Sequence, residues 1–343
     1  MTFNPIRQKG ETAAGDNNDV RETVADAAAC LLAALRQAES HTDGWQYQAL
    51  GYALVEEALS ACLSQLATTG LWGRANQLPS DVLWQVTGAM LETGWLQQRA
   101  RKKPLGYAGD YELLAAIMEE RCCEHPLGRL FDRYFQNQAA PSAVRSRTQH
   151  AARALAAHAM TRPAEGYQIA SVGAGTGMDV QYGLALLPPS VRRRAKVILL
   201  ELDDQGLRFA KSQVAALAGE ENVTGIRENL LRLGRKAGSD KLLGDPSFLI
   251  CSGLFDYLDD DAAIDLLKLF WRRLATGGQM VVGGFLPSHS TRGYMEWIGN
   301  WYLIYRMPDD MMRIAAAAGI PVDCCDAGVD RIGAGLFLTA TKP

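Results

Sequence analysis

Apolar residues recur at three- and four-residue intervals from Asp19 to about Gln138, which is the spacing of amphipathic helices. Cap-type residues open several of these segments, and glycine or proline closes others. The predicted helices cover residues 16–40, 47–70, 78–103, 111–122, 126–138 and 142–160. Ser80 or Asp81 is the predicted cap of the third helix, and Asp110 is that of the fourth. This part of the chain is therefore predicted to form a helical domain.

The pattern changes after Pro163, where short apolar runs typical of buried strands alternate with helical or loop stretches. These runs cover residues 167–177, 195–204, 223–229, 247–253, 277–285, 322–328 and 335–343. Such alternation predicts an α/β domain with a Rossmann-like, doubly wound, mostly parallel sheet. The predicted division is a disordered tail at 1–18, a helical N-terminal domain at 19–144 and the sheet domain at 145–343.

Composition narrows the class of protein. Of the 343 residues, 48% are hydrophobic and 21% are charged, and the net charge is -3. We therefore expect no nucleic-acid partner, and the short apolar runs predict no stable membrane insertion and no secretory signal. The seven cysteines show no CxxC spacing and the five histidines no metal-ligand spacing, so we expect reduced thiols, a cytoplasmic location and no metal. The oligomeric state is open, with a homodimer among the options.

A glycine-rich turn follows the first predicted strand, in "SVGAGTGMD". Gly173, Gly175 and Gly177 allow the backbone to turn sharply and to approach a ligand closely. The next helix begins there and offers free amide groups. A dinucleotide fingerprint would place glycine at position 178, where this chain has Met178, and Asp179 follows. The spacing therefore speaks against an NAD-dependent dehydrogenase.

Polar residues stand at the ends of the following strands. Glu201 ends the second strand, where a carboxylate can accept hydrogen bonds from both ribose hydroxyls of a nucleoside, and Asp203 is the nearby alternative. Asn229 follows the third strand, where its amide can contact an adenine edge. "FLICSGLFDYL" then ends the fourth strand near the expected switch in strand order, where ligands bind.

This ordered set resembles the class I S-adenosylmethionine-dependent methyltransferases over residues 165–343. The resemblance implies S-adenosylmethionine as the cofactor and a small molecule as the methyl acceptor. The implied cofactor residues in this domain are Gly173, Ala174, Gly175, Thr176, Gly177, Asp179, Glu201, Leu202, Asn229, Leu230 and Ser252.

A narrower resemblance covers residues 80–343 and rests on "KKPLGYAGDYELL", "SGLFDYLDDDAAIDLL" and "MEWIGNWYLIYRMPDDMMRIAAAAGI". These segments resemble the bacterial extracellular factor 3-hydroxypalmitic acid methyl ester biosynthesis proteins. The resemblance implies methyl transfer to the carboxylate of a hydroxy fatty acid or a similar metabolite. A carboxylate is ionised at neutral pH and needs no general base, but it needs a clamp of positive charge or hydrogen-bond donors.

Several side chains are candidates for the chemistry. Arg306 is the predicted carboxylate clamp, with Tyr302 and Tyr305 adding hydroxyl donors from the same helical face, although that face could equally be core packing. Arg292 is a second candidate clamp, and His289, in the loop after the fifth strand, is either a general base or a solvated loop residue.

Asp256 and Tyr257 lie just past the fourth strand. Tyr257 could face the sulfonium or donate to the substrate, and Asp256 could orient an amine or hydroxyl nucleophile. The latter role would favour N-methylation or hydroxyl O-methylation of another metabolite. A non-catalytic nucleoside-binding protein is the alternative of a different class.

The turn "GYAGDYE" stands apart from these motifs. Gly106 and Gly109 permit backbone shapes closed to other residues, and Asp110 can cap the helix that follows. The helical domain is predicted to serve as a lid or substrate domain. This turn is predicted to fold over the carboxyl ends of the strands and to close the site, so that Tyr107 and Tyr111 approach the cofactor or the acceptor. Asp110 is a further predicted cofactor residue.

Overall fold

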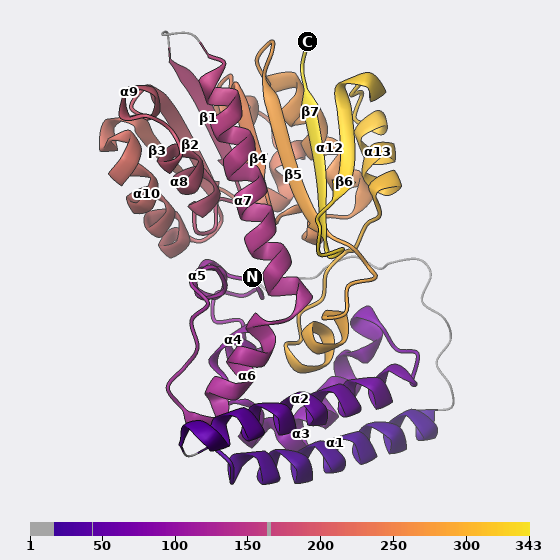
Figure 1. Cartoon of the computed structure of the whole chain (residues 1–343). Coiled ribbons are helices and arrows are strands. Elements are labelled where there is room, and N and C mark those ends of the chain that lie inside the picture. Colours follow the sequence, from indigo (N-terminus) through magenta and orange to yellow (C-terminus); the bar gives the residue numbers. More distant parts are fainter. Residues whose placement is uncertain (1–16, 43, 163–165) are drawn as a thin grey trace. The chain divides into compact units, whose positions relative to one another are not determined.

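The computed structural model describes residues 17–42, 44–162 and 166–343. The chain divides into two compact units, which are coloured by sequence in Figure 1. The helical unit comprises the described residues up to Ser142 together with Ser290–Leu303, and the sheet unit comprises Ala143–His289 and Ile304–Pro343. A single boundary at 144/145 does not capture the second stretch of the helical unit. Of the predicted tail at 1–18, residues 1–16 lie outside the described residues, and the remaining two begin the first helix.

The sheet unit contains one seven-stranded sheet. Its strands are β1 (Tyr167–Val172), β2 (Ala195–Glu201), β3 (Val223–Arg227), β4 (Phe248–Cys251), β5 (Gln279–Phe285), β6 (Cys325–Val329) and β7 (Gly335–Thr341). The strand order is β3-β2-β1-β4-β5-β7-β6, and β7 runs antiparallel to both of its neighbours. The order reverses between β1 and β4, so the carboxyl ends of these two strands mark the switch point. The predicted Rossmann-like sheet is confirmed.

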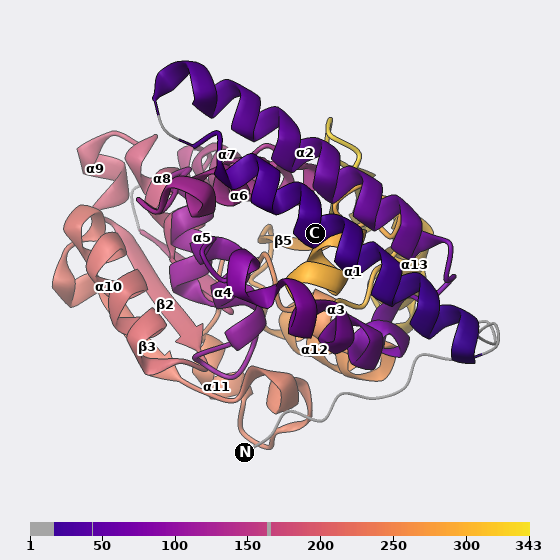
Figure 2. The same cartoon turned by 90° about the horizontal axis from the view of Figure 1, so that it is seen from below.

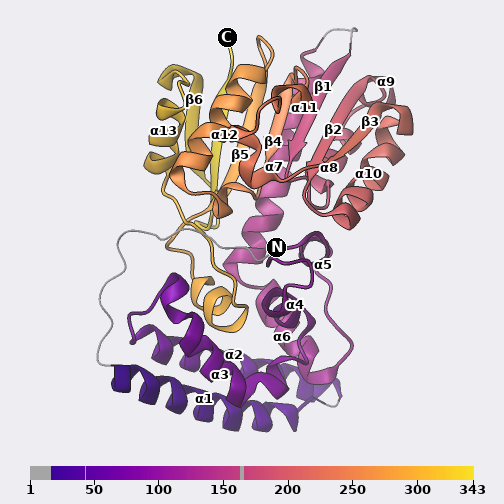
Figure 3. The ribbon, with the colours of Figure 1, turned by 180° about the vertical axis from the view of Figure 1, so that it is seen from behind.

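Helices cover both faces of this sheet, as Figures 1 and 3 show from opposite sides. One face packs against α7 (Ala139–Met160), α8 (Met178–Ala185), α9 (Pro189–Arg192) and α10 (Asp204–Ala218). The other packs against η3 (Leu230–Arg235), α11 (Asp240–Leu243), α12 (Asp260–Arg273) and α13 (Pro308–Ala317). Successive residues of β4 alternate between the two cores: Phe248 and Ile250 belong to the first, and Leu249 and Cys251 to the second. Short helical turns complete the unit at η2 (Glu220–Asn222), η4 (Phe255–Tyr257) and η6 (Val322–Cys324).

The helical unit is built from two separate stretches of chain. Its elements are α1 (Asn17–Glu39), α2 (Trp45–Ala67), η1 (Gly73–Asn76), α3 (Gln77–Leu91), α4 (Trp95–Lys102), α5 (Tyr111–Met118), α6 (Pro126–Gln136) and the π-helix η5 (Tyr294–Ile298). Helices α1 and α2 lie side by side, as Figures 1 and 2 show. Trp297 of η5 is fully buried, and its carbonyl oxygen accepts a hydrogen bond from Ser80 Oγ. The second stretch therefore forms part of this unit's core.

The predicted helix at 78–103 is two helices, α3 and α4, and neither Ser80 nor Asp81 caps the first of them. The break falls at Gly94, where an added Cβ would lie 2.9 Å from the Cβ of Phe131, so glycine is required for close packing of α6. Ser80 is buried inside α3, because η1 runs directly into that helix and moves its start to Gln77. Asp81 forms an ion pair with Arg101.

The predicted helical face at 301–306 is also wrong. Residues 299–307 form no regular structure, and Asn300 adopts a positive φ of 48°. Tyr302 belongs to the helical unit, whereas Tyr305 and Arg306 belong to the sheet unit. These side chains therefore do not share one helix face.

Candidate functional site

The glycine-rich turn between β1 and α8 is held against the end of β2. The amides of Gly173 and Ala174 both donate to the carbonyl oxygen of Leu200, at 2.9 and 3.0 Å. Gly173, Gly175 and Gly177 have φ values of 72°, 51° and 67°, in the left-handed region where side chains are disfavoured. An added Cβ at Gly173 would be in ordinary van der Waals contact with the Cβ of Leu254 at 3.6 Å, so this glycine is required by its backbone conformation and not by crowding. Close approach of a cofactor to this turn stays a prediction.

Glu201 lies directly beside this turn. Its Oε2 accepts a hydrogen bond from the amide of Gly175 at 2.8 Å, and its Oε1 accepts one from the amide of Leu202 at 2.7 Å. The side chain is 5% exposed, and burial raises the pKa of the carboxyl while the three amides of Gly175, Asp203 and Leu202 oppose that shift. Asp203, the predicted alternative, instead caps α10 by accepting from the amide of Gly206.

Two further predicted cofactor residues meet at the switch point. Ser252, after β4, donates from Oγ to Oδ2 of Asp179, in the first turn of α8, at 3.0 Å. Asp179 is buried, and this burial raises the pKa of its carboxyl against the hydrogen bonds from Val180 and Ser252. Thr176 is buried as well, and its Oγ1 accepts from the amide of Met178. The turn, α8 and the end of β4 are therefore joined by hydrogen bonds.

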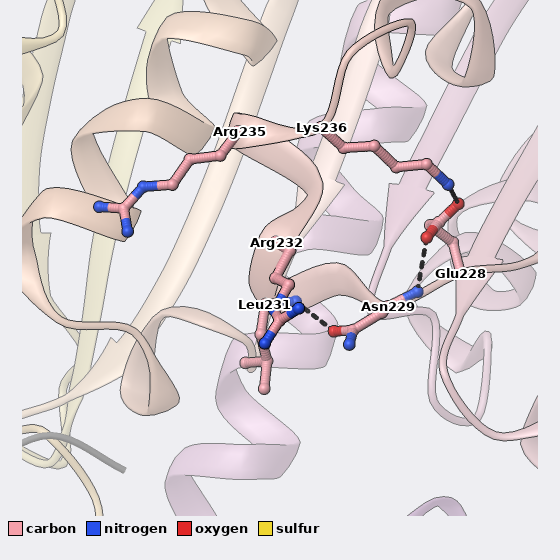
Figure 4. Close-up of a pocket in the computed structure, with 6 residues that line it drawn as sticks. All are labelled: Glu228, Asn229, Leu231, Arg232, Arg235 and Lys236. Atoms are coloured by element: carbon pink, nitrogen blue, oxygen red, sulfur yellow. Dashed lines mark hydrogen bonds and ion pairs between the residues drawn. The ribbon is translucent and has the colours of Figure 1, made fainter. Parts of the chain in front are cut away.

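Asn229 and Leu230 follow β3 at the start of η3. Asn229 lies in an open depression of about 510 Å³. Its lining residues, drawn in Figure 4, are Glu228, Asn229, Leu231, Arg232, Arg235 and Lys236. The Asn229 Oδ1 accepts from the amide of Leu231 at 3.2 Å, which leaves the two hydrogens of its side-chain amide available. Leu230 is buried in the core beneath. Because Glu201 and Arg227 are register partners at the ends of β2 and β3, Asn229 and Glu201 lie at the same edge of the sheet.

A buried ion pair that the sequence analysis missed lies at this edge. Arg147 of α7 places Nη1 3.5 Å from Oδ2 of Asp256, and the two side chains are 8% and 5% exposed. The guanidinium lies 5.0 Å from the ring centroid of Phe285, whose amide donates to the other Asp256 oxygen at 2.9 Å. An added Cβ at Gly283 would lie 2.7 Å from Arg147 Cδ, so this glycine makes room for the arginine.

The buried pair gives Asp256 an unusual titration. Burial raises the pKa of Asp256 to about 6, against the opposing effects of Arg147 and of the Phe285 amide. A sequence signal for Arg147 did exist, since it follows the helical spacing of the buried Ala151 and Leu155. An arginine at an apolar register position indicates a buried charge that needs a partner.

The structure contradicts the predicted role of Arg306. Arg306 is fully occupied by its own chain: its guanidinium donates to the carbonyl oxygens of Phe255 and Leu258 and pairs with Asp260 at 2.8 Å. It therefore braces η4 and α12 and is not available as the predicted carboxylate clamp.

His289 is buried and not solvated. Its ring centroid lies 5.5 Å from that of Phe285 and 5.4 Å from that of Tyr305. Tyr257 is half-buried at the end of η4, next to Asp256. The catalytic roles of His289 and Tyr257 stay predictions.

Tyr107, Asp110 and Tyr302 belong to the helical unit, so they are described within it. Asp110 caps α5 through the amide of Leu113, as predicted, and pairs with Arg99 at 2.8 Å. Gly109 packs on the ring of Trp301, where an added Cβ would lie 2.5 Å from a ring carbon. The turn and the "WYLIYR" segment are therefore in contact. The roles of Tyr107 and Asp110 toward the cofactor stay predictions.

Arg292, the second candidate clamp, is also engaged. Its Nε pairs with Oε1 of the fully buried Glu296 at 2.7 Å, and its guanidinium stacks on Trp72. Within the described residues, no group of three or more metal-ligating side chains is found, and all seven cysteines are free thiols. None of the described helices is long and apolar enough to cross a membrane.

Comparisons with known proteins extend the fold assignment. No family model and no curated protein matches the chain. Among solved structures, a possible exported protein from Bordetella parapertussis is 20% identical over 92% of this chain and 97% of its own, with a TM-score of 0.60. The CurJ carbon methyltransferase is 13% identical over 94% and 91% of the two chains, with a TM-score of 0.49. Magnesium protoporphyrin IX methyltransferase from Synechocystis, solved with bound SAH, is 15% identical over 60% and 87%, with a TM-score of 0.44. The Bordetella protein, at a TM-score of 0.60 and 20% identity, speaks for the fold alone, so the activity must be argued from the site.

Proposed function

We propose that this protein is an S-adenosylmethionine-dependent methyltransferase that acts on a small molecule. The observation that carries the proposal is the hydrogen bond of the Glu201 carboxylate to Gly175, at the edge where the strand order reverses. It places a buried acceptor of hydrogen bonds beside a backbone that a ligand can approach closely. A nucleoside with two ribose hydroxyls fits that combination.

The residues present suit the parts of this cofactor. The Oε2 of Glu201 has a lone pair left for a ribose hydroxyl, whereas its Oε1 already accepts from the amides of Leu202 and Asp203. The side-chain amide of Asn229 can donate to an adenine nitrogen. Asp179 offers a buried carboxylate for the ammonium of the methionine moiety, and Arg147 offers a cation for its carboxylate. When bound, the cofactor supplies an activated methyl group on its sulfonium.

We propose a carboxylate as the methyl acceptor, and a hydroxy fatty acid or a similar metabolite as its source. The two candidate bases of the sheet unit, Asp256 and His289, are both buried, and Asp256 is engaged by Arg147 and by the amide of Phe285. Such groups are poorly placed to deprotonate an amine or hydroxyl. An acceptor that is already ionised at neutral pH avoids this requirement.

Two measurements test these proposals in turn. Calorimetry with S-adenosylhomocysteine tests the cofactor, with NAD as the control ligand, and affinity for NAD alone would refute the assignment. Mass spectrometry of reactions that offer S-adenosylmethionine with carboxylate, amine and phenol acceptors then tests transfer. Methylation of the amine or phenol alone would contradict the carboxylate proposal, and cofactor binding without any transfer would favour a nucleoside-binding protein.

A further inference from the structure

Arg101 and Lys103, two residues apart at the end of α4, form a basic cluster in the helical unit with Arg74, because both arginines act electrostatically on Lys103. Arg101, near the end of α4, donates to Ser80 Oγ at 2.9 Å and to Oδ1 of Asp81 at 2.6 Å, and its guanidinium lies 4.4 Å from the ring centroid of Trp84. Lys103 follows on the same segment. Arg74 comes from η1, which precedes α3. The charge of Asp81 is shared with Arg101, so the cluster carries more positive than negative charge.

Lys103 is held in an unusual conformation. It is the C-cap of α4, with φ 48° and ψ 58° in the left-handed region that usually takes glycine or asparagine. Its Nζ lies 6.0 Å from the ring centroid of Tyr302, which belongs to the second stretch of the helical unit. Among the described residues, this ammonium has no hydrogen-bond or ion-pair partner.

The pKa shifts of Lys103 and Arg74 also indicate that the cluster lacks negative charge. Burial lowers the pKa of Lys103 to about 8, and Arg101 and Arg74 lower it further, while Asp81 opposes them. Burial also lowers the pKa of Arg74. A half-buried cation such as Lys103 is unfavourable without an anion, because it loses hydration and is repelled by the neighbouring arginines. A bound anion would relieve both effects.

We propose that the helical unit binds a small oxyanion, a carboxylate or phosphate group, between Arg74, Arg101 and Lys103 beside Tyr302. The ammonium of Lys103 and the exposed guanidinium of Arg74 supply the free donors. Arg101, fixed by Ser80 and Asp81, supplies charge. The site lies wholly within one unit and does not depend on the proposed methyl transfer.

Calorimetry on the full-length protein without cofactor tests this site, with hexanoate and inorganic phosphate as separate probes. The titrations are run at pH 8 in two buffers with different ionisation enthalpies, which reports protons taken up on binding. We expect saturable binding of at least one probe with net proton uptake, because the anion raises the pKa of Lys103. The preferred probe distinguishes a carboxylate from a phosphate ligand.

Matched variants identify the residue. Lys103→Met should weaken binding about tenfold or more. Lys102→Met should change it less than about twofold, because Lys102 carries the same charge next to it but pairs with Glu92 on the surface. Lys103→Arg should keep binding but lose the proton uptake, since arginine is always protonated.

The outcomes separate this site from the proposed function and from misfolding. Lys103→Gly relieves the left-handed strain, so it should unfold no earlier than the wild type by circular dichroism and yet lose the anion. Absence of saturable binding for both probes, or an equal loss in the Lys102→Met and Lys103→Met proteins, would overturn the anion site. Either result would leave cofactor binding untouched.

Discussion

Two carboxylates stand two positions apart at the end of β2 and do different things. Glu201 turns inward and accepts from the amide of Gly175, whereas Asp203 accepts from the amide of Gly206 and caps α10. Both side chains have the same charge and follow the same strand. Their comparison therefore separates a binding carboxylate from a structural one.

We expect Glu201→Gln to lower the affinity for S-adenosylhomocysteine roughly tenfold or more, because the ribose loses a charged acceptor worth about 1.5–3 kcal/mol. Asp203→Asn keeps an oxygen for the cap and should change the affinity less than about twofold. Calorimetry on both proteins measures the two effects. Equal losses in the two variants would mean that Glu201 has no special place in the cofactor site.

Asp256 should leave a signature in the pH dependence of stability. Its pKa is about 6 in the folded chain and 3.8 in the reference state, so the native protein holds a proton between these values that the unfolded chain releases. The wild type should therefore lose stability relative to Asp256→Asn as the pH rises from about 4 to about 6. The expected change is up to about 3 kcal/mol.

Urea unfolding of both proteins across this pH range measures that difference. Asparagine keeps an oxygen for the amide of Phe285, but it leaves Arg147 without its partner, so an offset that is constant with pH is also expected. The pH-dependent part alone reports the titration. Parallel curves for the two proteins would contradict a raised pKa.

At the scale of single elements, the glycines of the turn have separate tasks. An added Cβ at Gly173 would be in ordinary van der Waals contact with the Cβ of Leu254 at 3.6 Å, whereas one at Gly177 would lie 2.9 Å from the Cβ of Ala210 and 3.1 Å from its Cα. The third glycine of the turn therefore lets α8 pack closely on α10, and the first is required only by its backbone conformation. Both glycines have similar positive φ values, so substitutions of the two can be compared directly.

We expect Gly173→Ala to cost about 1–2 kcal/mol of stability, from its backbone conformation alone, and to lower the affinity for S-adenosylhomocysteine. Gly177→Ala should cost about 1–3 kcal/mol more, because α8 and α10 must also move apart. Thermal unfolding and calorimetry measure these quantities. A larger loss of stability in Gly173→Ala would reverse the assignment.

The elements themselves were largely predictable from local pattern. The seven strands follow from short apolar runs, and the cap at Asp110 follows from a side chain that can accept from a free amide. The break at Gly94 and the irregular path at 299–307 were not predictable, because they are set by contacts with Phe131 and with distant parts of the chain. The sequence suggested Arg306 as a clamp because it does not show that this guanidinium donates to the carbonyl oxygens of Phe255 and Leu258.

At the scale of the whole molecule, the helical unit depends on a segment far away in sequence. Residues 290–303 contribute the fully buried Trp297 and Glu296, and the Glu296 carboxylate accepts from the amide of Gly73 and from the side chain of Asn76. Loss of a buried tryptophan alone typically costs about 3–5 kcal/mol. A domain boundary drawn from the helical pattern cannot reveal this dependence.

We therefore expect a fragment of residues 17–142 to be markedly less stable than the same fragment joined to 290–303 by a flexible linker. The thermal midpoint, followed by circular dichroism, should fall by about 10 °C or more, because each kcal/mol shifts it by several degrees in a domain of this size. Identical midpoints for the two proteins would show that the helices form a complete core without η5.

The late position of residues 290–303 in the sequence affects how the helical unit folds during synthesis. A ribosome makes the protein from its N-terminus, and domains generally fold as they emerge. Here residues 17–142 emerge without Trp297, which is buried in their core, and all of β1 to β5 must be translated before residues 290–303 appear. The helical unit, although it comes first in the sequence, is thus completed late. During that interval we expect part of its apolar interior to stay uncovered, which is the condition in which nascent chains need chaperones.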